Sequence, residues 1–304
     1  LGTEQVVVQN HVTDEEDVAT RHGPARPGRE DLSGRHECAR RTVSQGEFAV
    51  IYSKPTREWF RDWFGEEYLA LYPHRDAEEA RQAVELYREI ASPQPGSRLL
   101  DLACGAGRHL RELRAAGLEA TGLDLSLTLL RAARSGAAND PLVRGDMREL
   151  PFSSGSFGGL TSYFTSFGYF AQASDDRKVV QEMARVLAPG GTFMLDFLNA
   201  SRVREDLVPE DCRVVEGRRV VQVREIHGGV VVKRIRIEPV EGGPSRHFEE
   251  RVRLYSCEEL VSLLAGSGLA TTARFGDYEG APFSGRSPRL ILAGRLDPAG
   301  EEAT

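Results

Sequence analysis

The chain has 304 residues, of which 40% are hydrophobic and 28% are charged, as in an ordinary globular enzyme. This composition excludes disordered, collagen-like and membrane-spanning proteins. The formal net charge of −7 offers no overall positive field for nucleic acid or anionic lipid. The length suffices for a large hydrophobic core in one domain or two.

The four cysteines lie far apart, and no two of them form a Cys-x-x-Cys pair. We therefore expect no structural metal site and no disulfide framework, and a reducing cytoplasmic location fits this spacing. The chain has no run of 18 apolar residues, and its first residues lack the pattern of an export signal. The sequence thus predicts neither a membrane span nor secretion.

Residues 1–48 are polar, charged and aperiodic, and they predict a disordered tail. Aromatic residues then recur every three to four positions over residues 59–72, which suits one face of a helix. A second helix is predicted from Asp76, a capping residue with Glu79 at the capping-box position, and it ends before Pro93.

From Arg98 onward, short apolar runs alternate with helical stretches, which is typical of βαβ units and a parallel sheet. The strands are predicted at 98–102, 119–123, 141–145, 157–163, 191–197, 270–276 and 289–295. The helices are predicted at 107–116, 126–135, 175–188 and 257–266.

Apolar residues alternate with a period of two between Val221 and Leu254, with glycine-rich turns between the runs. This pattern predicts an antiparallel meander of about 45 residues. The α/β pattern resumes after it, so the meander is expected to be an insertion into the α/β domain.

The most informative segment is the apolar run that ends in Asp101-Leu-Ala-Cys-Gly-Ala-Gly107. A strand that ends in a glycine-rich turn and opens a helix lets a ligand approach backbone N–H groups. A dinucleotide site would show a third glycine, but that position is Leu110. The carboxylate of Asp101 would repel a pyrophosphate and attract the α-ammonium of S-adenosylmethionine (SAM), which favours SAM as the cofactor.

Two further acids follow predicted strands. Asp124 is placed to accept both ribose hydroxyls of a nucleotide. Asp146 can accept the adenine amino group, and the backbone N–H of Met147 can donate to the ring. Each acid has a structural alternative, because Asp101 and Asp124 could cap helices and Asp146 could form an Asx-turn.

These motifs, with Tyr163–Phe170 and Leu187–Asp196, resemble the successive motifs of class I SAM-dependent methyltransferases over residues 98–197. The resemblance implies an α/β fold with a doubly wound, mostly parallel Rossmann-like sheet of seven strands in the order 3-2-1-4-5-7-6. SAM would lie across the carboxyl ends of strands 1, 2 and 4. The cofactor-binding residues it implies are Asp101, Ala103, Gly105, Gly107, Asp124, Leu125, Asp146, Met147, Tyr163 and Arg75.

The resemblance also suggests how the chain is divided. Residues 49–92 would form N-terminal helices that cover the cofactor site. The SAM-binding domain would comprise 93–198 and 256–296. Residues 199–255 would form the inserted antiparallel sheet, either a substrate lid or an oligomer interface.

Together with the loop 278–289, the inserted sheet resembles small-molecule methyltransferases. The expected reaction is an in-line methyl transfer to N or O, or to an activated carbon. Candidate bases for a hydroxyl acceptor are His74, His109, Tyr163 and Asp277, none of them convincing. Aromatic residues of the N-terminal helices and of residues 163–170 suggest an enclosed, partly apolar pocket for a small molecule. Substrate contacts are predicted at Tyr169, Tyr278, Phe283 and Arg286. The predicted partners are a small acceptor and, in a homodimer, a second copy of the chain, with no nucleic acid and no membrane.

Structural alternatives exist here too, since the loop after residue 276 could be a mere connection and Arg75 a solvated side chain. Two other functions share these features. A catalytically silent SAM-binding module would bind the cofactor and transfer no methyl group. An NAD-dependent oxidoreductase would share the fold, and NADH instead of SAM would then stabilise it.

Overall fold

The computed structural model describes residues 58–72, 77–93, 96–137 and 139–297. The predicted tail 1–48 lies outside these residues, as do His74, Arg75 and Asp76.

The main sheet has seven strands in the order β10-β11-β5-β4-β1-β2-β3. Its strands are β1 (Arg98–Leu102), β2 (Glu119–Asp124), β3 (Leu142–Arg144), β4 (Phe157–Ser162), β5 (Leu187–Leu198), β10 (Leu269–Phe275) and β11 (Arg289–Leu296). Strands β1 to β5 pair in parallel, whereas β11 runs antiparallel to both of its neighbours. This is the predicted order 3-2-1-4-5-7-6, and the fold class is confirmed.

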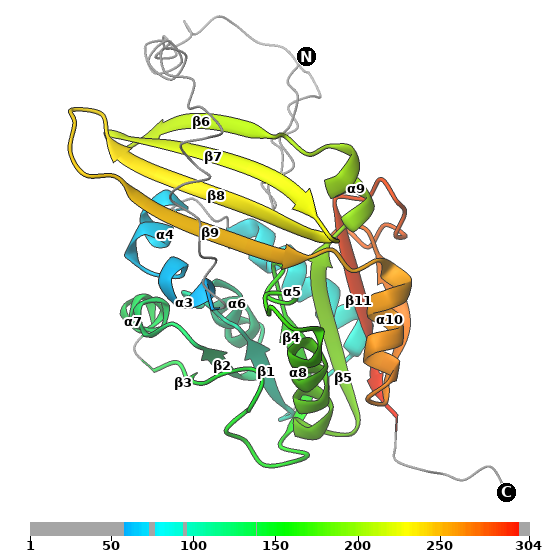
Figure 1. Ribbon diagram of the computed structural model, residues 1–304. Helices are drawn as coiled ribbons and strands as arrows, with labels where there is room; N and C mark the ends of the chain where they lie inside the picture. Colours follow the sequence, from blue (N-terminus) through cyan, green and yellow to red (C-terminus); the bar gives the residue numbers. More distant parts are fainter. Residues whose placement is uncertain (1–57, 73–76, 94–95, 138, 298–304) are drawn as a thin grey trace, which may run out of the picture.

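Helices cover both faces of this sheet (Figure 1). The principal ones are α5 (Ala77–Ala91), α6 (Arg108–Ala115), α7 (Leu127–Gly136), α8 (Ala173–Val186) and α10 (Cys257–Ala265). Helices α5 and α6 lie behind the sheet in this view, and α8 and α10 lie in front. Adjacent residues of β1 therefore belong to hydrophobic clusters on opposite faces of the sheet. Leu99 packs with residues of α5 and α6, and Leu100 packs with residues of α8. Burial on both faces explains why the strands are continuous apolar runs.

The aromatic segment forms two short helices, α3 (Phe60–Trp63) and α4 (Glu66–Leu71). The prediction of one helix over 59–72 is therefore wrong. Phe64 leaves the helical conformation, with ψ of 68°, and Gly65 is extended. The break lets both helices turn aromatic side chains toward the same core, where Trp63 and Tyr68 are buried.

The chain between β5 and α10 forms helix α9 (Ala200–Glu205) and a separate antiparallel sheet. Its strands are β6 (Glu210–Val215), β7 (Arg218–His227), β8 (Val230–Pro239) and β9 (Arg246–Arg253). Sequence periodicity identified the last three of these and missed β6. Figure 1 shows this sheet lying across the α3–α4 end of the molecule.

The inner face of the four-stranded sheet packs on α3 and α4. The Trp63 ring lies 5.0 Å from that of Phe248, and the Trp63 indole N–H donates to Glu250. Glu67 of α4 forms ion pairs with Arg218 of β7 and Arg246 of β9. The inserted sheet and the two N-terminal helices are thereby joined through both apolar and charged contacts.

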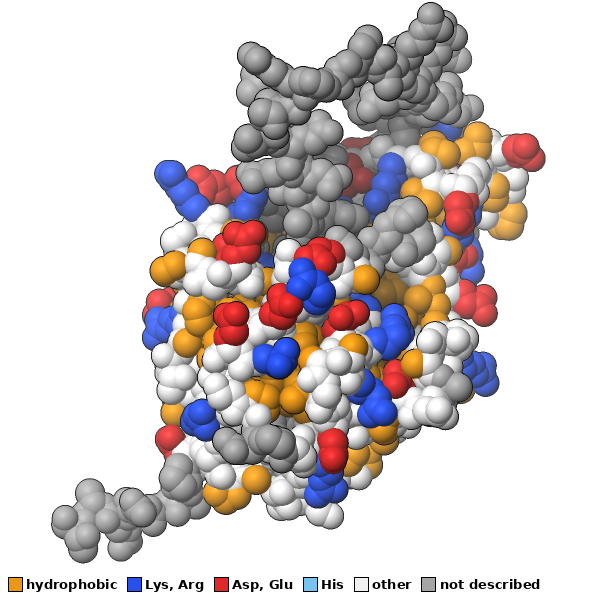
Figure 2. Space-filling model, turned by 180° about the vertical axis from the view of Figure 1, so that it is seen from behind, with side chains coloured by type: hydrophobic (Ala, Val, Ile, Leu, Met, Phe, Trp, Pro, Cys, Tyr) orange, Lys and Arg blue, Asp and Glu red, His pale blue; other side chains and the backbone are white. Residues whose placement is uncertain are grey.

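Acidic and basic side chains are interspersed over the face seen from behind in Figure 2. On α5, for example, Arg81 lies between Glu78 and Glu85 and pairs with both. Within the described part of the chain, no helix is long and apolar enough to cross a membrane.

Candidate active site

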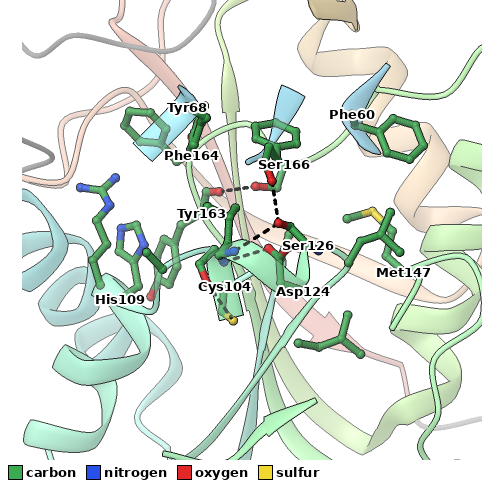
Figure 3. A pocket seen from close by; sticks show the side chains of 18 of the residues that line it. Phe60, Tyr68, Cys104, His109, Asp124, Ser126, Met147, Tyr163, Phe164 and Ser166 are labelled. Carbon is green, nitrogen blue, oxygen red and sulfur yellow. Dashed lines mark hydrogen bonds between the residues drawn. The ribbon is translucent and has the colours of Figure 1, made fainter. Parts of the chain in front are cut away.

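A cavity of about 290 Å³ opens where β1, β2 and β4 end, under α3 and α4 (Figure 3). Nine residues singled out from the sequence line it: Ala103, Gly105, His109, Asp124, Leu125, Asp146, Met147, Tyr163 and Tyr169. They come from the last residue of β2, from the turns after β1, β2, β3 and β4, and from helix α6. The convergence follows from topology, because the carboxyl ends of parallel strands meet at one edge of the sheet.

The glycine-rich turn after β1 lines one side of the cavity. Ala103, Gly105 and Gly107 have φ values of 60°, 57° and 77°, and Gly107 is the residue before the first turn of α6. Glycine adopts such left-handed conformations readily. The turn brings backbone N–H groups and the positive end of α6 close to the cavity, which suits the carboxylate of an amino-acid moiety.

Asp124 joins the ends of β1 and β2 at the cavity. One carboxylate oxygen accepts the Gly105 N–H at 2.9 Å, and the other accepts the Ser126 N–H at 2.8 Å. Burial raises the pKa of Asp124, and these backbone hydrogen bonds counteract it. Each oxygen still has a lone pair for a hydroxyl donor. Two backbone hydrogen bonds thus fix the carboxylate at the cavity, where it keeps acceptor capacity for a ligand hydroxyl.

Asp101 belongs to β1, just before the glycine-rich turn; it is only 1% exposed and is not part of the cavity lining. Burial and the nearby Asp124 raise its pKa to about 8. Its Oδ2 atom has no hydrogen-bond partner in the described parts of the chain. A buried carboxylate oxygen without a donor fits the α-ammonium of SAM, which would supply both the charge and the hydrogen bond.

Asp146 lines the cavity and is paired within the protein. Its Oδ1 accepts the backbone and Nε hydrogens of Arg148 at 3.0 Å, and its Oδ2 accepts from the same guanidinium at 2.6 Å. Burial acts to raise the pKa of Asp146, but Arg148 lowers it on balance. Oδ2 retains a lone pair for an amino group, and Met147 presents its side chain to the cavity (Figure 3).

Tyr163 and His109 form one wall of the cavity. Their rings stack at 4.2 Å with an interplanar angle of 17°. Burial and the charge of Asp101 raise the pKa of Tyr163 well above 10.0. The phenol therefore stays protonated at neutral pH and is poorly suited to remove a proton.

Aromatic side chains of the N-terminal helices and of the loop after β4 form the opposite wall, as the sequence predicted for a partly apolar pocket. Most belong to α3, α4 and the turn after each: Phe60, Phe64, Tyr68 and Tyr72, with Phe170 from the loop after β4. The Phe64 ring stacks on that of Tyr169 at 5.8 Å, and the Phe64 carbonyl accepts the Ser126 hydroxyl at 2.5 Å. The expectation that aromatic residues of the N-terminal helices and of residues 163–170 enclose a pocket is therefore confirmed, although the individual rings of α3 and α4 were not named as site residues.

Other predicted site residues lie away from the described lining of the cavity: Gly107, Asp277, Tyr278, Phe283 and Arg286. The buried Tyr278 hydroxyl donates to Asp196, Phe283 packs against the core, and Arg286 is exposed. The carboxylate of Asp277 accepts backbone N–H groups of its own loop. In the described residues there is no cluster of three or more side chains suited to hold a metal ion.

The site has counterparts in known proteins. A family model described as a methyltransferase domain matches residues 100–195. A dTDP-3-amino-3,6-dideoxy-alpha-D-glucopyranose N,N-dimethyltransferase of Streptomyces fradiae is 31% identical over 65% of this chain and 77% of its own length. The demethylmenaquinone methyltransferase of Corynebacterium kroppenstedtii is 39% identical, but the match spans 34% of this chain and 43% of that enzyme.

Solved structures agree with the fold. The CcbJ methyltransferase of Streptomyces caelestis superposes with a TM-score of 0.66 at 19% identity, covering 77% of this chain and 98% of its own. The sugar N-methyltransferase KedS8 of Streptoalloteichus has a TM-score of 0.58 at 25% identity, over 77% and 94%. The chain belongs to the class I SAM-dependent methyltransferases. This membership favours SAM over the dinucleotide alternative.

Proposed function

We propose that this protein transfers a methyl group from SAM to an amine nitrogen of a small molecule. One observation carries the proposal: a single cavity joins a polar half, built from strand ends, to an aromatic half, built from α3, α4 and the loop after β4. The polar half suits a nucleoside with an amino-acid tail. The aromatic half suits a partly apolar acceptor.

In the polar half, Asp124 would hold the ribose hydroxyls, Asp101 the α-ammonium and the Gly105 turn the carboxylate of the cofactor. Asp146 and the Met147 backbone would border the adenine. When bound, SAM supplies a methyl group already activated on a sulfonium. What remains for the protein is to align the acceptor and exclude water.

The aromatic half supports an amine acceptor for an electrostatic reason. Methylation of an amine leaves a cationic product, and faces of Phe64, Tyr68 and Tyr169 would stabilise a cation near them. A neutral amine needs no general base, whereas a hydroxyl does. Tyr163 is held protonated by its raised pKa, which argues against a role as that base.

Two relatives support the same class of acceptor by their names. The Streptomyces fradiae relative and one from Streptomyces venezuelae, 29% identical over 72% of this chain and 93% of its own length, are both N,N-dimethyltransferases of dTDP-amino sugars. Amino sugars and their nucleotide derivatives are therefore the first acceptors to test.

The test has two stages. Calorimetric titration should detect binding of SAM and S-adenosylhomocysteine, and no binding of NADH. Methyl-labelled SAM is then incubated with matched panels of small amines, amino sugar nucleotides, phenols and alcohols, and products are identified by mass spectrometry. Methylation of amines is the expected result. Absence of SAM binding would overturn the proposal, and binding without any methylated product would identify a silent module.

The proposal includes a cytoplasmic location and a homodimer. The location rests on the wide cysteine spacing and on the buried free thiols of Cys104 and Cys257. Cys212 is disulfide-bonded, which the sequence analysis did not expect. Analytical ultracentrifugation of the purified chain measures the oligomeric state directly.

A further inference from the structure

The turn that follows β4 has an unusual backbone. Phe164 and Thr165 have φ values of 60° and 59°, the left-handed conformation, at two successive residues that are not glycine. Bulky and β-branched side chains adopt it at a cost, so the surrounding structure must hold it in place. The turn lies between Tyr163 and Ser166, and Tyr163, Phe164 and Ser166 all line the cavity.

Asp196 of β5 holds this turn through two hydrogen bonds. Its carboxylate Oδ2 accepts the Phe164 N–H at 2.6 Å, and its backbone carbonyl accepts the Thr165 N–H at 3.1 Å. The residue is fully buried. A charged acceptor makes the first hydrogen bond stronger than a neutral one, and burial prevents water from competing for it.

The same carboxylate is itself fixed by buried partners. Its Oδ2 also accepts from the Tyr278 hydroxyl at 2.6 Å and from the Arg289 guanidinium at 2.9 Å. Arg289 continues to Glu79 of α5, and Glu79 pairs with Arg108 of α6 at 2.6 Å. Two helices, two strands and the loop before β11 thus contribute to one charge network, here called the Asp196 network: Glu79, Arg108, Asp196, Tyr278 and Arg289.

This network reaches the cavity at Phe164. The guanidinium carbons of Arg108 and Arg289 lie 4.7 Å and 5.0 Å from the centroid of the Phe164 ring, within range of cation–π attraction. The ring is therefore held by two cations while its backbone N–H is held by the carboxylate. Figure 3 shows Phe164 and Tyr163 on the same side of the cavity.

We propose that Asp196 is a positioning residue of the acceptor site, which maintains the left-handed turn Phe164–Thr165 and so places the wall formed by Tyr163 and Phe164. This inference rests on the proposed function and adds that the acceptor, rather than SAM, depends on the Asp196 network. The two halves of the cavity should therefore respond differently to its disruption.

The first test is Asp196→Asn, which keeps the size of the side chain and removes its charge. Hydrogen–deuterium exchange at the Phe164 and Thr165 amides should accelerate at least tenfold. The Kd for SAM should stay within about threefold, while kcat/KM for the acceptor found in the amine panel falls at least tenfold. Unchanged exchange at both amides would overturn the inference, as would unchanged acceptor kinetics.

Asp176→Asn is the matched control. Asp176 of α8 is also fully buried and accepts from a tyrosine hydroxyl, that of Tyr255 at 2.8 Å, and from Arg253 at 3.3 Å. These two contacts of Asp176 do not involve Phe164 or Thr165. This variant should lose a comparable amount of thermal stability without faster exchange at Phe164 and Thr165. Equal acceleration in both variants would show a general loosening of the fold and refute a positioning role.

A compensating variant tests whether Asp196→Asn acts on catalysis through the backbone of the turn or through the loss of the charge. Because glycine adopts positive φ without strain, Thr165→Gly should restore part of the lost kcat/KM in the Asp196→Asn background. Thr165→Gly alone provides the reference for this cycle. Additive losses in the double variant would contradict the inference. If the wild-type protein fails to bind SAM, the proposed function fails instead, and the exchange results still report whether Asp196 holds the turn.

Discussion

The imidazole of His109 lies parallel to the phenol of Tyr163, 4.2 Å away, although the two residues come from α6 and from the end of β4. Both side chains are buried, at 5% and 3% exposure. The stacked pair fixes the angle at which the phenol meets the cavity. Whether Tyr163 can act as a general base depends on the protonation state of its phenol.

Tyr163→Phe should leave the pH dependence of kcat unchanged between pH 6 and about 9. Burial keeps the pKa of the phenol well above its usual range, so the hydroxyl does not ionise in this interval. The loss in kcat should be less than about tenfold, since a general base contributes roughly 10²–10⁴. Initial rates across this pH range provide the measurement. Loss of an ionisation from the profile would assign Tyr163 the role of base.

Asp101→Asn should stabilise the protein without SAM increasingly as the pH rises. Burial raises the pKa of Asp101 from 3.8 to about 8, so the folded protein keeps a proton that the unfolded chain has lost. Asp101 therefore contributes its full stability to the wild-type protein below about pH 4, and this contribution to the free energy of unfolding falls as the pH rises to about 8, because the unfolded chain releases this proton first. Melting temperatures at intervals from pH 5 to pH 9 measure it.

The difference in melting temperature between Asp101→Asn and wild type should grow up to about pH 8 and then level off. Parallel curves for the two proteins would show that Asp101 is ionised throughout. The same variant should bind SAM at least tenfold more weakly, because a neutral amide cannot balance the ammonium charge.

Asp124→Ala should raise the Kd for SAM by about 10- to 100-fold, since a hydrogen bond to a charged group contributes about 1.5–3 kcal/mol. The variant also removes the acceptor of the Gly105 N–H. Calorimetric titration measures the change. Glu119→Gln is a suitable control, because Glu119 is exposed at the opposite end of the same strand. A Kd within threefold of wild type for Asp124→Ala would exclude the proposed ribose contact.

Lys233→Met should destabilise the protein by about 3–5 kcal/mol, the usual result of removing one partner of a buried ion pair. Lys233 and Glu250 are 0% and 1% exposed and lie 2.7 Å apart on paired strands of the inserted sheet. Lys233→Met with Glu250→Gln should recover much of this loss, since no uncompensated charge remains. Urea denaturation compares the two. Equal losses would mean that the lysine contributes packing rather than charge balance.

The sequence predicted the parallel sheet well because its signals are local. Strand β1 was placed at its observed residues, and its abrupt end at a glycine-rich turn follows from the composition of that turn. The same reasoning selected Asp124, which is the last residue of the buried strand β2. Residues at the carboxyl end of a strand can therefore be identified from the sequence alone.

The Asp196 network could not be derived in that way. Arg289 meets Asp196 and Glu79 across 93 and 210 residues of chain, and no periodicity links such distant positions. Tyr278 shows the resulting error of interpretation. Its loop composition suggested a substrate contact, but packing buries its ring beside Arg289 and its hydroxyl on Asp196.

The origin of the two cavity walls has an evolutionary consequence. The cofactor half is formed by turns of the main sheet, whereas most aromatic rings of the acceptor half belong to α3, α4 and the turns after them, which the inserted sheet supports through Glu67 and Trp63. On the proposed assignment of the two halves, substitutions in that short segment would change the accepted molecule and leave the nucleoside contacts intact. On that assignment, natural selection could diversify the acceptor through the short α3–α4 segment without redesigning the scaffold that holds the cofactor.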